Sequence, residues 1–303
     1  MMNAVTEEIK QLKKEKNAVI LAHYYVEDAV QEIADYIGDS YYLSRLATET
    51  TADVVVFCGV GFMGESAKVL NPGKKVLMPD MSADCPMAHM ADIAGIEKLR
   101  AEYEDLAVVC YINSTAELKA HADVCVTSSN ALKIVKALPN KHILFIPDDN
   151  LGHFIAEQAP EKEFLYQNGH CPVHKAIAPE AVKKAKQEHP QALVLAHPEC
   201  LPEVSALADY VGSTSGIIDY ATKSDAEEFV ICTETGVFYE LKKKNPGKKF
   251  YPASAHQICP DMKKITLEKV RDVLKNESNA VTVEKELSEK SGRPLERMLE
   301  LAK

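Results

Sequence analysis

Three Cys-Pro dipeptides recur along this chain at nearly equal intervals. They stand at Cys85-Pro86, Cys171-Pro172 and Cys259-Pro260, which are 86 and 88 residues apart. A turn and a short apolar run precede each dipeptide, and the first and third turns share the sequence Asn-Pro-Gly-Lys-Lys. Self-similarity at a fixed period indicates that one structural unit is repeated. The spacing therefore predicts three related units, each ending in a cysteine loop.

Each unit contains four short apolar runs separated by helix-like stretches. Ala-Asp pairs at residues 34–35, 122–123 and 208–209 keep the same period between the runs. Strands rich in Val and Ile that alternate with helices indicate parallel βαβ units buried on both faces. The expected fold class is α/β, with three homologous small αβα domains around a pseudo-threefold axis and a central active site.

The period also predicts where the units begin and end. We expect domains at residues 1–87, 88–173 and 174–261, and a charged helical tail over residues 262–303 that packs back on the first domain.

Composition restricts the possible partners and the cell compartment. The chain has 35 Lys and Arg against 45 Asp and Glu, a formal net charge of −10, which argues against a nucleic-acid face or an anionic membrane surface. The apolar runs are far shorter than the roughly 20 residues that cross a bilayer. Residues 1–16 resemble a charged helix rather than a signal peptide. We expect a cytosolic protein without a disulfide framework, although it has eight cysteines.

Ligands of open parallel sheets bind beyond the carboxyl ends of the strands, so the three cysteine loops could meet in one cavity. Three thiolates suit a 4Fe-4S cluster with one iron left open, or a zinc site that His170, His174 or His256 completes. A simpler alternative is that Cys-Pro only marks the entrance to a turn in each unit.

The other cysteines lie in or beside apolar strands and are expected to be inert core thiols: Cys58, Cys110, Cys125, Cys200 and Cys232.

Polar groups suited to proton transfer follow the first strand of each unit. These groups are His23 and Tyr25, then Tyr111 and Asn113, then His197 and Glu199. Histidine titrates near neutrality and a buried carboxyl can have a raised pKa, so both can move protons. Any one of them alone is more often structural, and their equivalent positions in the repeat make them candidates.

Hydroxyl groups follow the second strand of each unit, immediately before a predicted helix. Ser40, Ser128, Ser213 and Thr214 could bind carboxylate or phosphate at the helix starts without net positive charge, or could simply be N-caps. Lys68 could reach the same cavity, or could be solvated.

A glycine-rich run at residues 59–64 imitates a dinucleotide fingerprint and leaves an NAD-dependent dehydrogenase as an alternative. It follows the third strand of its unit instead of the first, and the other units lack it, so the match is weak.

Together these motifs resemble the quinolinate synthase (bacterial quinolinate synthetase A) family over nearly the whole chain. The resemblance is carried by the cysteine spacing and by Ala-His-x-Tyr, Ile-Gly-Asp-Ser, Phe-Met-x-Glu-Ser-Ala-Lys, Tyr-Ile-Asn-Ser, Thr-Ser-Ser-Asn-Ala, His-Pro-Glu-Cys and Gly-Ser-Thr-Ser-Gly. It implies a transferase of NAD biosynthesis that condenses iminoaspartate with dihydroxyacetone phosphate to quinolinate, releasing phosphate and two waters. An L-aspartate oxidase or dehydrogenase would supply iminoaspartate.

The resemblance also implies roles for residues of this chain. It implies that Cys85, Cys171 and Cys259 hold the 4Fe-4S cluster, whose open iron acts as a Lewis acid. The implied substrate contacts are His23, Ser40, Tyr111, Asn113, Ser128, His197, Glu199 and Thr214. Tyr25 and Glu199 match the proposed acid-base groups, and His174 matches a further active-site histidine.

Some members carry extra cysteines after the third ligand, but Pro260, Asp261 and Met262 follow Cys259 here. Redox control by such a pair is therefore not expected, and a non-catalytic iron-sulfur sensor remains a rival.

Overall fold

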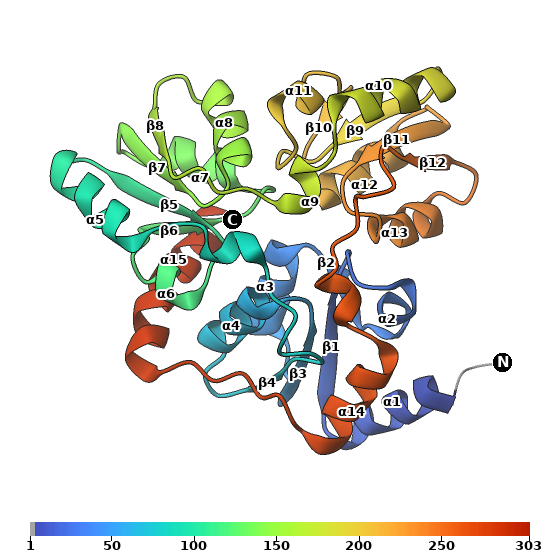
Figure 1. Ribbon diagram of the computed structural model, residues 1–303. Coiled ribbons are helices and arrows are strands. Elements are labelled where there is room, and N and C mark those ends of the chain that lie inside the picture. The colour runs from blue at the N-terminus through green and yellow to red at the C-terminus, as the bar shows by residue number, and fades with distance from the viewer. Residues whose placement is uncertain (1–3) are drawn as a thin grey trace.

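The computed structural model describes residues 4–303 and contains three parallel sheets of four strands each. Each sheet, together with its helices, forms one lobe, and the three lobes stand around a common centre (Figure 1). The α/β class and the three αβα domains expected from the sequence are confirmed.

The strands recur in the same order in all three lobes. The first sheet contains β1 (Ala18–His23), β2 (Tyr36–Gly38), β3 (Val54–Cys58) and β4 (Lys75–Leu77). The second contains β5 (Ala107–Tyr111), β6 (Val124–Val126), β7 (His142–Ile146) and β8 (Glu163–Tyr166). The third contains β9 (Leu193–Ala196), β10 (Tyr210–Val211), β11 (Glu228–Cys232) and β12 (Lys249–Pro252).

Helices connect these strands. The first lobe has α1 (Ala4–Glu15), α2 (Asp28–Ile33), α3 (Ser40–Glu49), α4 (Gly61–Leu70) and the short 3-10 helix η1 (Pro86–His89). The second has α5 (Ile93–Glu102), α6 (Ala116–Lys119), α7 (Ala131–Ala137), α8 (Asp149–Gln158) and α9 (Pro172–Lys175). The third has α10 (Pro179–Glu188), α11 (Pro202–Ser205), α12 (Thr214–Lys223) and α13 (Val237–Lys244). The chain ends with η2 (Met262–Lys264), α14 (Leu267–Asn276) and α15 (Lys285–Leu301).

Strand order explains where a site can form. Each sheet has the order second, first, third, fourth, and all pairs are parallel. The central strands, such as β3 and β5, are buried along their whole length, as their unbroken Val-rich sequences require. The order reverses between the first and third strands, and ligands of open α/β sheets bind at this switch point.

The repeated Ala-Asp pairs have a structural role. One carboxylate oxygen of Asp35, Asp123 and Asp209 accepts the backbone N–H of Ile20, Val108 and Val194, at 2.8, 2.7 and 2.7 Å. Each aspartate therefore fastens the start of the second strand to the first strand, which is why the pair recurs in every unit.

The lysines of the turns before the fourth strands also recur for a structural reason. Lys74, Lys162 and Lys248 each donate to two backbone carbonyls at the end of a preceding helix. Helix C-termini leave carbonyls without partners and carry partial negative charge, so a lysine there stabilises the helix end.

The tail bridges two lobes. Helix α14 packs against α1, α2 and β3 of the first lobe, as expected, whereas α15 packs against β6, α6 and α7 of the second lobe as well as α4 of the first. The red tail in Figure 1 follows this path from the first lobe to the second. The domain boundaries themselves stay predictions. Among residues 4–303, no helix has both the length and the apolar character that crossing a bilayer requires.

Polar contacts join every pair of lobes close to the centre. Ser215 donates to Asp39 at 2.6 Å, the His197 ring lies 3.2 Å from the Ser128 hydroxyl, and Ala116 N–H donates to Glu65 at 2.8 Å. The lobes are therefore held in a fixed mutual arrangement by specific hydrogen bonds as well as by apolar packing.

The third lobe approaches the backbone of the first closely at Gly236. A Cβ atom there would lie 2.6 Å from the Tyr24 carbonyl oxygen and 2.7 Å from the Tyr25 Cα. Both are backbone atoms, so a rotamer change cannot relieve the clash.

We expect Gly236→Ala to lower the free energy of unfolding by about 1–3 kcal/mol, the usual effect of overpacking. Gly247→Ala is the matched control, because no heavy atom lies within 4 Å of the position its Cβ would take. Urea unfolding of both variants measures the difference, and equal stability would contradict this account of the contact.

Candidate active site

The switch-point edges of the three sheets surround one cavity of about 310 Å³. The carboxyl ends of the first strands and the loops that follow them contribute His23 and Tyr25, Tyr111 and Asn113, and His197 and Glu199. The three predicted cysteines line the same cavity. The structure thus brings together residues that are up to 236 positions apart in the sequence.

Each cysteine loop is tied to its own sheet in the same way. The backbone N–H groups of Gly61, Asp149 and Thr235 follow the third strands. They donate to the carbonyls of Ala83, Gly169 and Gln257, at 2.9, 2.8 and 3.0 Å. Each carbonyl lies two residues before a cysteine. Pro86 and Pro172 then begin short helical turns, where proline is favoured because its missing N–H is not needed.

The three thiols are free and lie close enough to influence one another. Burial raises the pKa of Cys85 to about 12, with smaller effects from Glu199 and Cys259. Burial likewise raises the pKa of Cys171 and Cys259, and Cys85 adds to the effect on Cys171. The donor set of three soft thiols around one cavity fits an iron-sulfur cluster or another thiophilic metal. Metal binding would have to displace the three protons.

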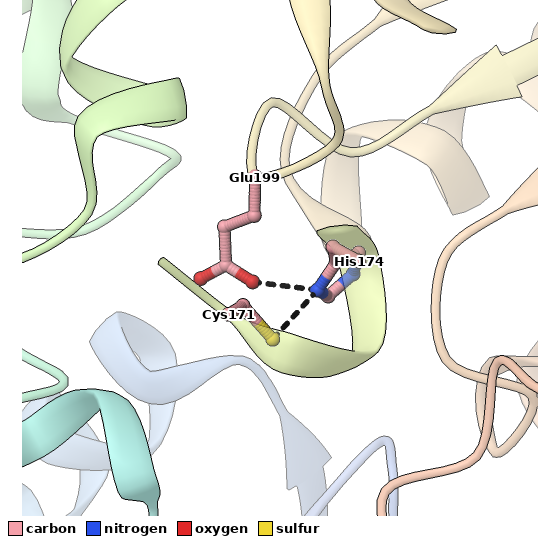
Figure 2. A group of neighbouring side chains, drawn as sticks. All are labelled: Cys171, His174 and Glu199. Atoms are coloured by element: carbon pink, nitrogen blue, oxygen red, sulfur yellow. Dashed lines mark hydrogen bonds and ion pairs between the residues drawn. The ribbon is translucent and has the colours of Figure 1, made fainter. Parts of the chain in front are cut away.

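The histidine three residues after Cys171 lies between that thiol and a carboxylate. His174 Nδ1 is 3.1 Å from Cys171 Sγ and 2.7 Å from Glu199 Oε2 (Figure 2). The three ligand atoms lie within 4.8 Å of one another, so this group could also hold a single zinc ion. Of the other histidines considered for zinc, His256 lines the cavity, whereas His170 is not among its lining residues and faces Lys175.

Protonation states in the cavity follow from burial and from the groups that face Glu199. Burial alone would raise the pKa of Glu199, but His174 and His197 outweigh it and lower the pKa to about 2. Burial lowers the pKa of His23 and His197 to about 3. Near neutral pH the cavity therefore holds an ionised Glu199 between neutral His23 and His197 rings.

A hydroxyl that the sequence analysis did not select completes a chain of hydrogen bonds. Thr233 Oγ1 lies 2.8 Å from Tyr25 Oη and 2.8 Å from His174 Nε2. Because His174 Nδ1 faces Glu199, the chain runs without a break from the Tyr25 phenol to the Glu199 carboxylate. Burial raises the pKa of Tyr25 well above its ordinary value, so the phenol is protonated. The signal for Thr233 was its position at the end of a third strand, beside Cys232.

Most of the predicted anion-binding hydroxyls reach the cavity. Ser40, Ser128 and Thr214 line it. Ser213 does not, because its hydroxyl accepts Gly216 N–H as the N-cap of α12. No Lys or Arg is among the lining residues of the described chain.

Lys68 is not brought to the cavity. Its ammonium group donates to the carbonyls of Pro72 and Lys74, at 2.9 and 2.8 Å, in the turn that follows α4. The sequence left open whether Lys68 reaches the cavity, and these carbonyl partners instead hold its side chain at the C-terminal end of α4.

Two buried acceptors in the cavity have no hydrogen-bond partner within the described chain. They are Glu199 Oε1 and Asn113 Oδ1. Buried polar atoms are rarely left without partners, so these two oxygens mark where a ligand with N–H or O–H donors would bind.

The glycine-rich run serves packing in this structure. It begins after β3, and a Cβ on Gly64 would meet the Met78 side chain at 2.3 Å. A Cβ on Gly59 would meet Met63 Sδ at 2.6 Å. The close approach of neighbouring side chains accounts for these glycines without a dinucleotide.

Comparison with known proteins identifies similar sequences over almost the whole chain. A family model described as quinolinate synthetase A protein matches residues 7–300. The chain is 52% identical over 298 residues to the quinolinate synthase of Caldicellulosiruptor saccharolyticus and 54% identical over 298 residues to that of Clostridioides difficile. In both cases 98% of each chain is covered. It is 50% identical over 300 residues to the quinolinate synthase of Aquifex aeolicus, covering 97% of this chain and 93% of that protein.

We expect Thr233→Val to lower the free energy of unfolding by about 1–3 kcal/mol, because the buried His174 Nε2 loses its hydrogen-bond partner. Thr235→Val is the control, since the Thr235 hydroxyl makes no hydrogen bond within residues 4–303 and its side chain is half-buried. Denaturant unfolding of the two variants tests this, and an equally stable Thr233→Val protein would show that the hydroxyl chain is not formed.

Proposed function

Because this chain belongs to the quinolinate synthetase A family, we propose that it condenses iminoaspartate with dihydroxyacetone phosphate to quinolinate, releasing phosphate and two waters. This reaction would supply the pyridine ring for NAD biosynthesis. The observation that carries the proposal is that one cavity is lined by Cys85, Cys171 and Cys259 together with Tyr25 and Glu199.

The three cysteines are proposed to hold one 4Fe-4S cluster per chain. When bound, such a cluster with three protein ligands supplies an iron that can act as a Lewis acid toward a substrate oxygen. Three free thiols, one from each lobe, support this assignment over the single zinc site, which would use only one of them.

The acid-base work is assigned to Tyr25 and Glu199. Glu199 is ionised and can accept a proton, whereas Tyr25 is protonated and can donate one. The hydrogen bonds through Thr233 and His174 connect the two groups, so a proton gained at Glu199 can be returned at Tyr25. Enolisation, imine formation and dehydration all need such alternating transfers.

The proposed substrates are anions, but among residues 4–303 no lysine or arginine lines the cavity. Ser40 and Thr214 are the first residues of α3 and α12, and Ser128 lies shortly before α7. Their hydroxyls, together with the helix N-termini, are proposed to bind carboxylate and phosphate. The neutral rings of His23 and His197 can donate further hydrogen bonds, and Tyr111 and Asn113 complete the proposed substrate contacts.

Iminoaspartate hydrolyses readily, so an enzyme that oxidises L-aspartate is proposed as its source. The rival functions are distinguishable from this one. A dehydrogenase would be colourless and would bind nicotinamide cofactor, and an iron-sulfur sensor would not form quinolinate from the two substrates. The cytosolic location stays a prediction.

We expect Cys85→Ala to abolish both the cluster and quinolinate formation, because two protein thiols remain where the cluster needs three. Cys58→Ala is the control, since Cys58 lies in the core of the same lobe, within β3. Iron and sulfide are counted after anaerobic purification, together with quinolinate release. A Cys85→Ala protein with a full complement of iron and sulfide would refute the ligand assignment.

We expect Tyr25→Phe to keep the cluster and to lower kcat about 10²–10⁴-fold, the usual contribution of a general acid or base. Tyr24→Phe is the matched control, because Tyr24 lies in the adjacent apolar core and is not among the cavity-lining residues. The absorption spectrum reports the cluster and steady-state turnover reports the chemistry. Unaltered turnover in Tyr25→Phe would remove this phenol from the mechanism.

A further inference from the structure

All three candidate ligand cysteines have their backbone N–H group bonded to a carboxylate. Cys171 N–H donates to Asp148 Oδ2 at 3.1 Å, and Cys259 N–H donates to Glu234 Oε1 at 3.1 Å. Cys85 N–H donates to Asp84 Oδ1 at 2.8 Å. None of these carboxylates was assigned a role by its sequence pattern or by the proposed reaction.

Two of the three carboxylates occupy the same position in the repeat. Asp148 and Glu234 each stand two residues after the third strand of their sheet, and both side chains are completely buried. In the first lobe this position is Val60, whose side chain has no hydrogen-bond acceptor. The Cys85 N–H instead donates to the exposed Asp84, the residue just before the cysteine. The same bond is therefore made by two different routes.

Each buried carboxylate connects two segments of chain. Asp148 Oδ1 accepts Leu151 N–H at 2.8 Å as the N-cap of α8, while its other oxygen holds Cys171. Glu234 Oε2 accepts Gly236 N–H at 2.6 Å, while its other oxygen holds Cys259. A side-chain amide could not replace either acid, because one end of an amide is a donor and would face a donor.

Further contacts show that these attachments are tight. A Cβ on Gly169, two residues before Cys171, would lie 2.3 Å from the Pro147 carbonyl oxygen, so this loop packs directly on the strand end that carries Asp148. Lys263 lies 3.0 Å from Glu234 Oε1 and donates to the Tyr25 carbonyl at 2.6 Å, so the Cys259 attachment is also joined to Tyr25.

We propose that Asp148 and Glu234 are positioning residues that hold Cys171 and Cys259 in the arrangement required to bind the iron-sulfur cluster. Neither carboxylate ligates the metal; each fixes the backbone of a ligand. This inference rests on the proposed cluster, but the attachment itself is made entirely by groups of the chain. Outer partners of metal ligands typically change metal retention 10–100-fold when they are removed.

The main test uses Asp148→Ser. Serine is a good N-cap and preserves the bond to Leu151 N–H, but its side chain is too short to reach Cys171 N–H. In metal-free protein, alkylation of Cys171 by iodoacetamide, followed by peptide mass spectrometry, should accelerate while that of Cys85 stays unchanged. In reconstituted protein, a chelator should remove iron about 10–100-fold faster than from the wild type.

Glu234→Gln gives an independent test at Cys259, with the same two measurements and the increased alkylation confined to Cys259. It keeps the proposal testable if Asp148→Ser does not fold. Asp84→Ala is the matched control, because its side chain is 53% exposed and water can replace it at the Cys85 amide. It should change iron retention less than either buried variant.

The outcomes separate this inference from the proposed function. If the folded Asp148→Ser and Glu234→Gln proteins alkylate and lose iron like the wild type, the positioning role is overturned although the cluster stands. If the wild type takes up no iron and sulfide, the cluster assignment fails. Unchanged alkylation of Cys171 and Cys259 in the metal-free variants would be enough to show that the two carboxylates do not hold these cysteines.

Discussion

The site depends on one backbone hydrogen bond in each lobe, which joins the segment after the third strand to the cysteine loop. It occurs in all three lobes, at 2.8–3.0 Å, and always two residues before the cysteine. A parallel strand has one fixed carboxyl end, so a loop fastened there must lie at the switch-point edge of its sheet. Three lobes built in this way, and joined by contacts such as Asp39 with Ser215, direct three thiols at one cavity.

Burial determines the charges in that cavity. Desolvation keeps His23 and His197 neutral and Tyr25 protonated. Burial would raise the pKa of Glu199, but its interactions with His174 and His197 and its hydrogen bonds lower it, so Glu199 is ionised. Within the described residues, the lining therefore offers neutral donors, and neither lysine nor arginine, to a ligand. Under the proposed function, these neutral donors would let a protein with a formal charge of −10 bind anionic substrates.

Two kinds of repeated residue can be distinguished. Asp35, Asp123 and Asp209 recur because every copy of the unit needs the same strand attachment, and they contribute nothing to the cavity. The residues that end the first strands and those that follow the third strands differ between copies, from His23 to Tyr111 and from Val60 to Glu234. The fold constrains the first kind equally in every lobe, whereas the shared cavity lets each lobe supply a different chemical group.

The three α/β units, their strands and the cysteine loops could be predicted from the residues alone, because hydrophobic period and turn residues act locally and occur three times in the chain. The sequence also located most of the site, since strand ends of parallel sheets have a known place. Thr233, Asp148 and Glu234 were not found in this way. Tyr25, a partner of Thr233, is 208 residues distant in the sequence, and the cysteine partners of Asp148 and Glu234 are bound through backbone N–H groups, which no side-chain motif marks. Lys68 was misplaced because nearby carbonyls, visible only in three dimensions, bind its ammonium group. Helix α15 reaches the second lobe for a similar reason: an amphipathic helix shows which face it will bury, but only the tertiary structure decides against which partner.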